Sequence, residues 1–350
     1  MDEPGERKLK VAVVGASGYT GSELVRILLG HPQAEFALLT AGGNAGRRFS
    51  ELHPQFNGVV DTVLADNSAL ANAELDYIFL ALPHRVSMDF VAGHDLERTP
   101  VIDLSGDFRL ADAATYEDWY EHAHSCPALL DSAAYGMSEL NRERIRDARL
   151  VANPGCYPTS AILPLTPLLR AGLIETAGII IDSKSGVSGA GNKPKPNLHF
   201  PQLHGNFSAY GLASHRHTPE IEQALGRAAG GDVTLQFTPH LLPVSRGILS
   251  TIYARPKPGV SQQAIDDALT EAYGAEQFIR LRSIPPSLAD VRGSNFCDMH
   301  AKLDQRSGNL LIVSAIDNLV KGAAGQAVQN MNIMAGLPEG SGLGQVALSP

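Results

Sequence analysis

The sequence of 350 residues contains only three cysteines, Cys126, Cys156 and Cys297. This odd and scattered set gives neither a disulfide framework nor a four-ligand zinc pattern, and it fits a reducing compartment. Long apolar runs are also missing. No stretch approaches the roughly 18 residues of a membrane helix, and the charged start, Met1 to Lys10, lacks the apolar core of a signal peptide. We therefore expect a cytoplasmic protein.

An excess of positive charge is likewise absent, because 28 Lys and Arg face 37 Asp and Glu, for a net charge of −9. This balance argues against broad binding to nucleic acid or to anionic membranes, although it leaves room for a local basic pocket. The length suits about two domains, and the 44% hydrophobic and 19% charged residues are typical of globular proteins. No internal repeat is apparent. We expect neither nucleic acid nor a membrane among the partners.

The first 150 or so residues alternate short apolar runs with helical patterns. The run over residues 9–14 stops at Gly15, helical spacing follows over 22–29, and Gly30-His31-Pro32 ends that helix. Further strands are predicted over 34–40, 76–82 and 100–104. Strands that are apolar throughout and separated by helices indicate a parallel sheet covered on both faces.

From about Val151 the pattern changes to glycine-rich and proline-rich loops between shorter elements. The sequence predicts a second, mixed α+β domain there, with a closely packed final helical stretch from Asn318 to about Met334. Its predicted strands cover 179–183, 233–239, 247–254 and 310–315, and its predicted helices cover 220–229 and 262–273.

A glycine-rich segment lies directly between the first predicted strand and the first predicted helix. Glycines three residues apart let a backbone turn tightly and approach a pyrophosphate, while the helix N-terminus presents N–H groups to the negative charge. The segment is a candidate dinucleotide site, although a purely structural turn gives the same pattern. It comprises Gly15, Ala16, Ser17, Gly18, Tyr19, Thr20 and Gly21.

The end of the second predicted strand carries no acidic residue to hold the ribose hydroxyls of NAD. Residues 40–46 are small or polar there, and Arg47 and Arg48 follow. Two guanidinium groups suit the 2′-phosphate of NADP. We expect NADP as the cofactor, with solvated loop charges as the alternative explanation of both arginines.

Cys156 stands in the segment Asn-Pro-Gly-Cys-Tyr-Pro-Thr, residues 153–159, which predicts a cysteine at a helix N-terminus. The helix dipole there favours the thiolate, which is the form that attacks an acyl carbon. The alternative is a buried cysteine that acts as a small hydrophobe. Pro164 and Pro167 predict a kink or a restart in this helix.

A thiol nucleophile needs a proton carrier, and His215 and His217 are both candidates. They precede a predicted helix in which Thr218 would be the N-cap and Pro219 the first helical residue. A loop before a helix can direct either side chain into a cleft.

Two other patterns carry no function. Residues 122–126, His-Ala-His-Ser-Cys, look like a metal clamp, but no second cluster completes four ligands, so we expect no metal. Residues 184–191 lack the final glycine of a nucleophile elbow and the lysine-serine pair of a P-loop. This weakens a hydrolase or kinase interpretation.

Several further motifs, in their order along the chain, carry a resemblance to a known family. Together with the glycine and cysteine segments they are residues 81–84, 103–110, 135–140, 215–221, 243–247 and 317–329. From Val11 to Leu337 the chain closely resembles the N-acetyl-gamma-glutamyl-phosphate reductases of arginine biosynthesis, which are relatives of the aspartate-semialdehyde dehydrogenases. The resemblance implies an α/β fold with a Rossmann-type NADP-binding domain, residues 1–153 plus 318–350. An inserted α+β catalytic and dimerisation domain, residues 154–317, would form the contacts of a homodimer or homotetramer.

The resemblance also implies the chemistry. Cys156 would attack the acyl phosphate N-acetyl-L-glutamyl 5-phosphate, phosphate would leave, and NADPH would reduce the thioester to N-acetyl-L-glutamate 5-semialdehyde. His217 would be the acid/base, with Glu220 nearby to orient or polarise it, while His215 remains possible as acid/base or as a substrate contact.

Four more residues receive roles from the resemblance alone. Arg109 and Asn153 would hold the substrate phosphate, for which a guanidinium fork is apt. Pro83 and Asn318 would contact the cofactor, with Asn318 near the nicotinamide.

The sequence departs from the family pattern at three places. Residues 40–42 are Thr-Ala-Gly where Thr-Ser-Arg is common, so the 2′-phosphate contact shifts to Arg47 or Arg48 or weakens. Met137-Ser138 replaces a usual Leu-Pro, and Arg85 stands where glycine is usual. We expect altered loop geometry and retained activity.

Two alternatives stay open. One is the reductase of a carrier-linked aminoadipyl phosphate in lysine biosynthesis, although its cysteine motif tends toward Gly-Ala-Gly-Cys-Asn-Ala-Thr. The other is an NADP-binding regulatory protein without turnover, against which the set of Cys156, His217 and Arg109 argues.

Overall fold

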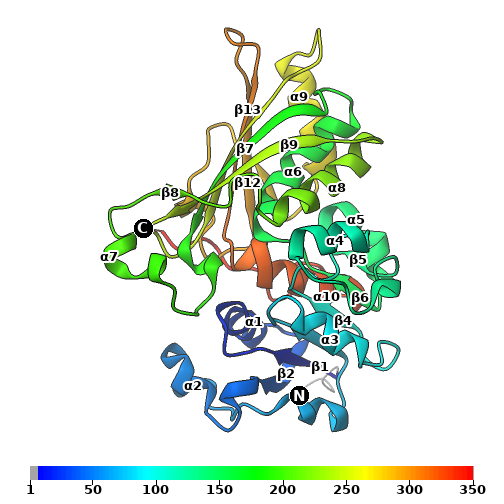
Figure 1. Cartoon of the computed structure of the whole chain (residues 1–350), viewed down its shortest axis with the longest axis vertical. Helices are drawn as coiled ribbons and strands as arrows, with labels where there is room; N and C mark the ends of the chain where they lie inside the picture. Colours follow the sequence, from blue (N-terminus) through cyan, green and yellow to red (C-terminus); the bar gives the residue numbers. More distant parts are fainter. Residues whose placement is uncertain (1–6, 350) are drawn as a thin grey trace, which may run out of the picture. The chain divides into compact units, whose positions relative to one another are not determined.

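The computed structural model describes residues 7–349, which divide into two compact units. Unit 1 comprises the described residues up to Glu117, His122–Pro154 and Ala323–Gly344. Unit 2 comprises Asp118–Glu121, Gly155–Gly322 and the described residues from Gln345 onward (Figure 1). Residues 1–6 and 350, which fall within the expected domain limits, lie outside the described residues.

Unit 1 is built on a six-stranded sheet in which all strand pairs are parallel. The strand order is β2-β1-β3-β4-β6-β5. β2 therefore lies on one side of β1, and the chain then crosses to the other side of β1 for β3 and the later strands. Residues 11–14 of β1 are fully buried, as expected for a strand covered on both faces. The strands are β1 (Leu9–Val14), β2 (Ala34–Thr40), β3 (Tyr77–Leu80), β4 (Val101–Asp103), β5 (Ala134–Tyr135) and β6 (Leu150–Ala152).

The final helix of the chain belongs to unit 1 and packs closely there, as its composition predicted. Asn330 donates from Nδ2 to the carbonyl of Gly136 at 2.8 Å, and a Cβ at Gly136 would lie only 2.4 Å from that nitrogen. The helices of this unit are α1 (Tyr19–Leu29), α2 (Phe49–Leu52), α3 (Val86–Ala92), α5 (Ser138–Arg146) and α10 (Gly325–Met334). α4 (Ala113–Tyr120) runs from unit 1 into the short segment 118–121 of unit 2.

Unit 2 contains a seven-stranded mixed sheet of order β11-β12-β13-β10-β7-β9-β8. Helices α6, α8 and α9 pack against strands of this sheet. Buried and more exposed residues alternate along β7 and β10, and Ile180 and Tyr253 are among the exposed ones. The helices are α6 (Cys156–Arg170), α7 (Phe200–Leu203), α8 (His217–Ala229) and α9 (Gln262–Tyr273). The strands are β7 (Ala177–Gly186), β8 (Ser208–Ala209), β9 (Thr234–Leu242), β10 (Ile248–Ala254), β11 (Ile279–Leu281), β12 (Cys297–Leu303) and β13 (Leu310–Ile316).

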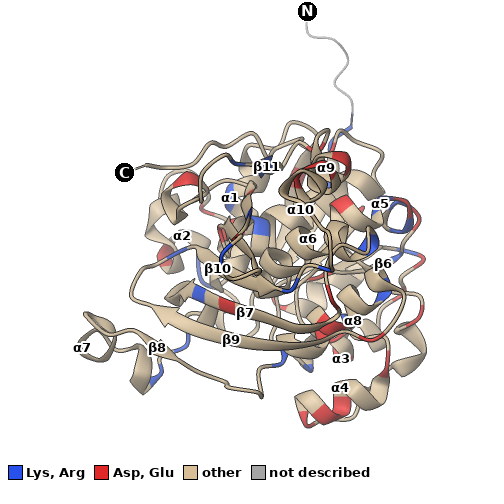
Figure 2. Cartoon of the chain, turned by 90° about the horizontal axis from the view of Figure 1, so that it is seen from above, with Lys and Arg blue, Asp and Glu red and all other residues tan. Residues whose placement is uncertain are grey.

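The two sheets confirm the predicted fold class, a Rossmann-type α/β domain with a mixed α+β domain. Figure 2 shows basic and acidic residues interspersed along the chain. Within residues 7–349, no helix is long and apolar enough to cross a membrane.

The predicted restart of the cysteine helix is wrong, because α6 runs from Cys156 to Arg170 through both Pro164 and Pro167, whereas a kink stays a prediction. A proline removes the N–H that the carbonyl four residues earlier would accept. For Pro167 that carbonyl is Leu163, and it accepts a hydrogen bond from the Tyr273 hydroxyl at 2.6 Å. α9 therefore supplies the donor that α6 lacks.

Candidate active site

The glycine segment forms the turn between β1 and α1, and two of its glycines are required by close packing. Gly15 has φ +87°, and a Cβ there would lie 2.4 Å from the carbonyl oxygen of Ala81. A Cβ at Gly21 would lie 2.4 Å from the carbonyl oxygen of Gly15. The N–H groups of Gly15 and Ala16 both donate to the carbonyl of Thr40, at 3.0 and 2.9 Å. These contacts fix the turn against β2 and the end of β3.

Gly18 is different, because the nearest protein atom to a Cβ there would be 3.6 Å away. It is the N-cap of α1, which has neither a side-chain cap nor an acidic residue in its first turn. The helix thus presents unpaired N–H groups at the carboxyl end of β1, where the sheet order reverses. These residues fit the pyrophosphate of a dinucleotide, since a bare helix N-terminus at such a switch point binds phosphate.

The end of β2 carries the residues expected to choose the dinucleotide. Thr40 is buried and donates from its hydroxyl to Asn67 Oδ1 at 2.6 Å. Arg48 donates to the carbonyl of Asp61 at 3.1 Å, whereas Arg47 Nε lies 3.6 Å from a carboxylate oxygen of Glu51, with both side chains about half exposed. An exposed pair of this kind contributes at most about 1 kcal/mol, so Arg47 can exchange Glu51 for a phosphate at little cost.

Pro83 is exposed in the loop after β3, and the following residues are tied to the loop after β4. His84 Nδ1 accepts the N–H of Gly106 at 2.8 Å, and the N–H of Arg85 donates to both Asp107 carboxylate oxygens, at 3.0 and 2.9 Å. Arg85 has φ +73°. A glycine at position 85 would adopt this positive φ without strain, because it has no Cβ.

Arg109 and Asn153 come together at the carboxyl ends of β4 and β6. The buried guanidinium of Arg109 donates to the carbonyls of Asn153 and Leu104, at 2.8 and 2.9 Å. The Asn153 amide donates to the carbonyl of Ala323 at 3.2 Å and accepts from Asn330 at 3.1 Å. These bonds fix the backbone at Asn153, three residues before Cys156, and a contact with the substrate phosphate stays a prediction.

Cys156 is the first residue of α6, as the sequence predicted, and it is half-buried. The N–H of the preceding residue, Gly155, donates to Oε1 of the buried Glu220 at 2.8 Å. A Cβ at Gly322 would lie 2.8 Å from the Cβ of Cys156, so the thiol-bearing residue packs against a bare backbone. The helix N-terminus favours a thiolate, and Glu220 fixes the peptide that carries it.

The two candidate histidines lie at the start of α8, which begins at His217. The predicted cap is wrong: the N-cap is Arg216, without a side-chain cap, and Thr218 and Pro219 lie inside the first turn. Pro219 is tolerated there because the N–H groups of a first turn have no intrahelical partner. His215 Nδ1 accepts the N–H of His217 at 3.1 Å.

Sequence reasoning missed a pair of tyrosines beside the cysteine. The hydroxyls of Tyr157 and Tyr210 are 3.0 Å apart, and the Tyr157 hydroxyl also lies 3.3 Å from the carbonyl of His240. Burial raises the pKa of Tyr210 to about 12, and negative charge on Cys156 acts in the same direction. Tyr157 could have been found from its place next to Cys156, whereas no local signal marks Tyr210.

Asn318, expected near the nicotinamide, is buried in unit 2 and holds two loops together. Its Oδ1 accepts the N–H of Gly247 at 2.8 Å, and its Nδ2 donates to the Ser188 hydroxyl at 3.0 Å. The loop that ends at Gly247 is the Pro-Val-Ser-Arg-Gly motif, so this motif and Asn318 form one hydrogen-bonded structure.

His124, in the segment 122–126, uses both ring nitrogens for hydrogen bonds to the backbone. His124 uses Nε2 toward the carbonyl of Asp107 at 2.9 Å, and its Nδ1 accepts the N–H of Cys126 at 3.2 Å. Among the described residues no group of three or more His, Cys, Asp or Glu is arranged to hold a metal ion.

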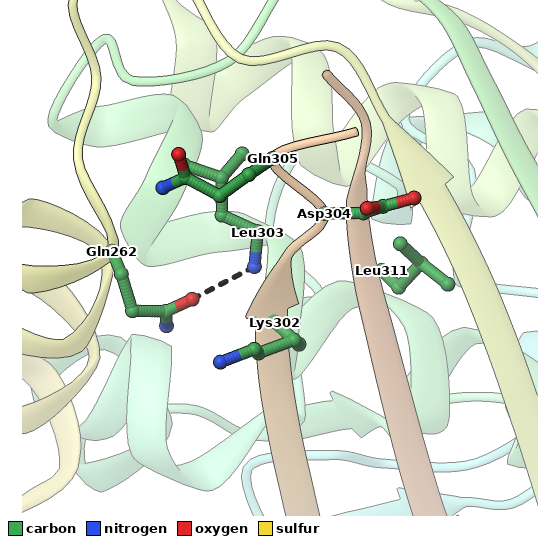
Figure 3. Close-up of a pocket in the computed structure, with 6 residues that line it drawn as sticks. All are labelled: Gln262, Lys302, Leu303, Asp304, Gln305 and Leu311. Carbon is green, nitrogen blue, oxygen red and sulfur yellow. Dashed lines mark hydrogen bonds between the residues drawn. The ribbon is translucent and has the colours of Figure 1, made fainter. Parts of the chain in front are cut away.

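A pocket of about 400 Å³ lies elsewhere in unit 2 and contains none of the expected site residues (Figure 3). It lies at the Leu310 end of β13, whereas Ile316 at the other end approaches Gly322 and hence Cys156. Gln262 in its wall accepts the N–H of Leu303 at 2.8 Å. The lining residues are Gln262, Lys302, Leu303, Asp304, Gln305 and Leu311.

Comparison with known families agrees with both units. Residues 10–148 match the family model for the semialdehyde dehydrogenase NAD binding domain, and residues 156–318 match that for the semialdehyde dehydrogenase dimerisation domain. Aspartate semialdehyde dehydrogenase II from Vibrio cholerae has the same fold, with a TM-score of 0.73 at 17% identity over 94% of this chain and 99% of that chain. The enzyme from Candida albicans, solved with NADP, gives 0.69 at 16% identity over 94% and 98%. The two family models, which together cover most of the chain, thus place it in the semialdehyde dehydrogenase class of oxidoreductases.

Curated relatives identify the family within this class. A relative from Geobacter sulfurreducens is 53% identical over 98% of this chain and 100% of its own length, and one from Pelotomaculum thermopropionicum is 50% identical over 98% and 99%. Both are named N-acetyl-gamma-glutamyl-phosphate reductase. The chain belongs to the N-acetyl-gamma-glutamyl-phosphate reductase family, which confirms the resemblance drawn from its motifs.

Proposed function

We propose that this enzyme uses NADPH to reduce N-acetyl-L-glutamyl 5-phosphate to N-acetyl-L-glutamate 5-semialdehyde and phosphate in arginine biosynthesis. The observation that carries the proposal is the arrangement around Cys156. Its helix N-terminus, the Glu220 bond to Gly155 and the start of α8 at His217 form one structure within unit 2. Relatives about half identical to this chain bear the name of this reaction.

In the proposed mechanism His217 takes the thiol proton, and the Cys156 sulfur attacks the acyl carbon. The C–O bond to phosphate breaks, phosphate leaves, and a thioester on Cys156 remains. When bound at residues 15–21, NADPH would supply a hydride to the thioester carbon. The C–S bond then breaks to give the aldehyde and the thiolate, with His217 as the group that holds or returns the proton.

NADP is proposed as the cofactor, held by residues 15–21, by Pro83 and Asn318, and by Arg47 at the 2′-phosphate. The uncapped α1, the lack of a carboxylate at the end of β2 and the weak Arg47–Glu51 pair support this choice. Arg47→Ala should raise KM for NADPH about tenfold and leave KM for NADH unchanged. Arg48→Ala is the matched control, because the Arg48 guanidinium already donates to Asp61. Equal effects of both substitutions on KM for NADPH would remove Arg47 from the 2′-phosphate site.

Arg109 and Asn153 are proposed to help hold the departing phosphate, because the Arg109 guanidinium donates to the carbonyl of Asn153, which lies three residues before Cys156. A homodimer or homotetramer in the cytoplasm is also proposed. The match to a dimerisation domain and the exposed Ile180 and Tyr253 on the unit 2 sheet support the assembly, and three free cysteines fit a reducing compartment. Light scattering after gel filtration measures the mass directly, and a single 37.2 kDa species would contradict the assembly.

The reaction is tested most simply in reverse, with N-acetylglutamate semialdehyde, phosphate and NADP, by the absorbance of NADPH. The wild type should reduce NADP only when phosphate is present, and Cys156→Ser should lose several orders of magnitude in rate. Cys126→Ser is the matched control, since Cys126 is also half-buried but lies in unit 1. Equal rates for wild type and Cys156→Ser would contradict the proposed role of Cys156 as the nucleophile.

A further inference from the structure

The turn before α8 is closed by a histidine side chain. His215 Nδ1 accepts the N–H of His217 at 3.1 Å, and the His215 carbonyl accepts the N–H of Thr218 at 2.9 Å. Arg216, the N-cap residue by position, has helical backbone angles and no side-chain cap. His215 therefore satisfies two of the N–H groups that every helix leaves unpaired at its N-terminus.

The ring of His215 is held in one orientation by aromatic neighbours. It makes edge contacts with Tyr157, Phe237 and Tyr210, at ring-centroid distances of 5.6, 5.2 and 5.7 Å. The rings of His215 and His217 are 4.8 Å apart. Since Tyr157 adjoins Cys156 in sequence, this packing joins the turn of α8 to the first turn of α6.

The pKa of His215 is consistent with a ring that serves as a hydrogen-bond acceptor. Burial lowers the pKa of His215 to about 4, and the charge of the adjacent Arg216 acts in the same direction. The ring is neutral at physiological pH, so its Nδ1 lone pair stays available to accept the His217 N–H, and the proton is assigned to Nε2 from this bond. A base this weak is poorly matched to proton transfer near pH 7.

We propose that His215 is a positioning residue, whose Nδ1 fixes the first turn of α8 and thereby holds His217 and Glu220 in place around Cys156. The assignment rests on the proposed function of Cys156 and His217, and it leaves the proton transfer to His217 alone. Residues three apart on a helix share a face, so one hydrogen bond at the helix start orients both side chains. Glu220 in turn holds the Gly155 N–H that precedes the nucleophile.

Two isosteric substitutions separate this role from acid/base catalysis. His215→Asn places Oδ1 near the position of Nδ1, where an asparagine readily accepts the N–H two residues ahead. His215→Gln places its oxygen near Nε2 and cannot make that bond in the same geometry. The readout is kcat/KM of the reverse reaction from pH 5 to 9, with urea unfolding of each variant to establish that it is folded.

For a positioning residue, Asn should stay within about threefold of wild type with the same pH profile, while Gln loses about tenfold or more. Loss of 10²-fold or more in a folded Asn variant, with one limb of the pH profile missing, would overturn the proposal, because that is the size of a lost general acid/base.

A measurement on the wild type covers the case in which a variant does not fold. Nitrogen-15 NMR of labelled histidine should show His215 as the neutral Nε2–H form throughout pH 6–8. Titration of His215 with a midpoint near 7 would overturn the proposal without any substitution. This spectrum does not depend on turnover, so a failure of the proposed reaction and a failure of the His215 assignment are distinguishable.

Discussion

Arg85 is one of three non-glycine residues with positive φ among the described residues, the others being Glu121 and Ala213. Its N–H is nevertheless held by Asp107, which also accepts the N–H of Met88 at 3.0 Å and thus caps α3. The surrounding hydrogen bonds therefore impose a backbone conformation that a side chain disfavours by roughly 1–2 kcal/mol.

Arg85→Gly should raise the free energy of unfolding by about 0.5–1 kcal/mol, since relief of the strained φ outweighs the extra entropy that glycine gives the unfolded chain. Arg85→Ala removes the same side-chain contacts but keeps the Cβ, so it is the control. Urea unfolding of all three proteins measures the difference. If Arg85→Gly and Arg85→Ala had the same free energy of unfolding, the backbone at position 85 would not be strained.

At the scale of single elements, the turn before α1 contains two kinds of glycine. Some are required by close packing, and Gly18 leaves space for a ligand. A Cβ at Gly21 meets backbone at 2.4 Å, whereas a Cβ at Gly18 meets no protein atom within 3.5 Å. The two positions are three residues apart in one turn, so they form a matched pair.

Gly18→Ala should fold with nearly unchanged stability but bind NADPH at least tenfold more weakly, because the added methyl occupies the phosphate approach. Gly21→Ala should lose several kcal/mol of stability, because α1 must move away from the turn. Urea unfolding and the fluorescence of bound NADPH report the two quantities. Unchanged NADPH affinity in Gly18→Ala would place the pyrophosphate elsewhere.

The contact between α6 and α9 depends on one hydroxyl. Tyr273→Phe leaves the Leu163 carbonyl buried without the donor that it has now, and this should cost about 1–3 kcal/mol. Pro167→Ala restores a helical N–H to the same carbonyl. In a double-mutant cycle followed by urea unfolding, Tyr273→Phe should therefore be much milder in the Pro167→Ala background. Additive effects would show that the hydroxyl does not compensate for the proline.

Elements with a clear local pattern were predicted from the sequence, as β1, β2 and α9 show with their predicted limits. β12 was missed because its polar residues resemble those of an exposed loop. Its Asp298 is fully buried only because Arg280 and Arg282 pair with it, at 2.5 and 2.6 Å. Such pairing between strands distant in sequence leaves no periodic signal.

The site shows the same limit. The place of Cys156 at a helix start could be predicted, because glycine and proline mark it locally. The start of α8 at His217 could not, since the cap is an imidazole rather than the expected Thr218 hydroxyl. Tyr210 reaches Tyr157 across 53 residues of chain through tertiary packing alone.

At the scale of the whole molecule, stability should depend on pH through a buried carboxyl. Burial raises the pKa of Asp103 to about 6, and the charge of Asp107 adds to this, while hydrogen bonds from Ser105 oppose it. The folded state therefore binds more protons than the unfolded chain between about pH 4 and 6. The stability that Asp103 contributes is complete below its ordinary pKa of 3.8 and is lost as the pH rises through 6.

Asp103→Asn removes this titration while its Oδ1 can still accept the Ser105 N–H. Relative to wild type, the variant should gain stability as the pH rises from 4 to 6 and keep a gain of up to about 3 kcal/mol at pH 8. Hydrogen bonds from Ser68 lower the pKa of the exposed Asp66, so Asp66→Asn should show the opposite sign. Urea unfolding at several pH values measures both, and a gain for Asp103→Asn that shrinks with rising pH would contradict the assignment.

The packing at Gly322 restricts which amino acid can stand beside Cys156. Its φ is not positive, so nothing in its backbone conformation demands glycine, yet a single methyl group would meet the Cβ of Cys156 at 2.8 Å. The space beside Cys156, and not the backbone conformation, therefore limits this position to glycine. An alanine would require the Gly322 segment or the start of α6 to move, and a shift of α6 would also displace the sulfur.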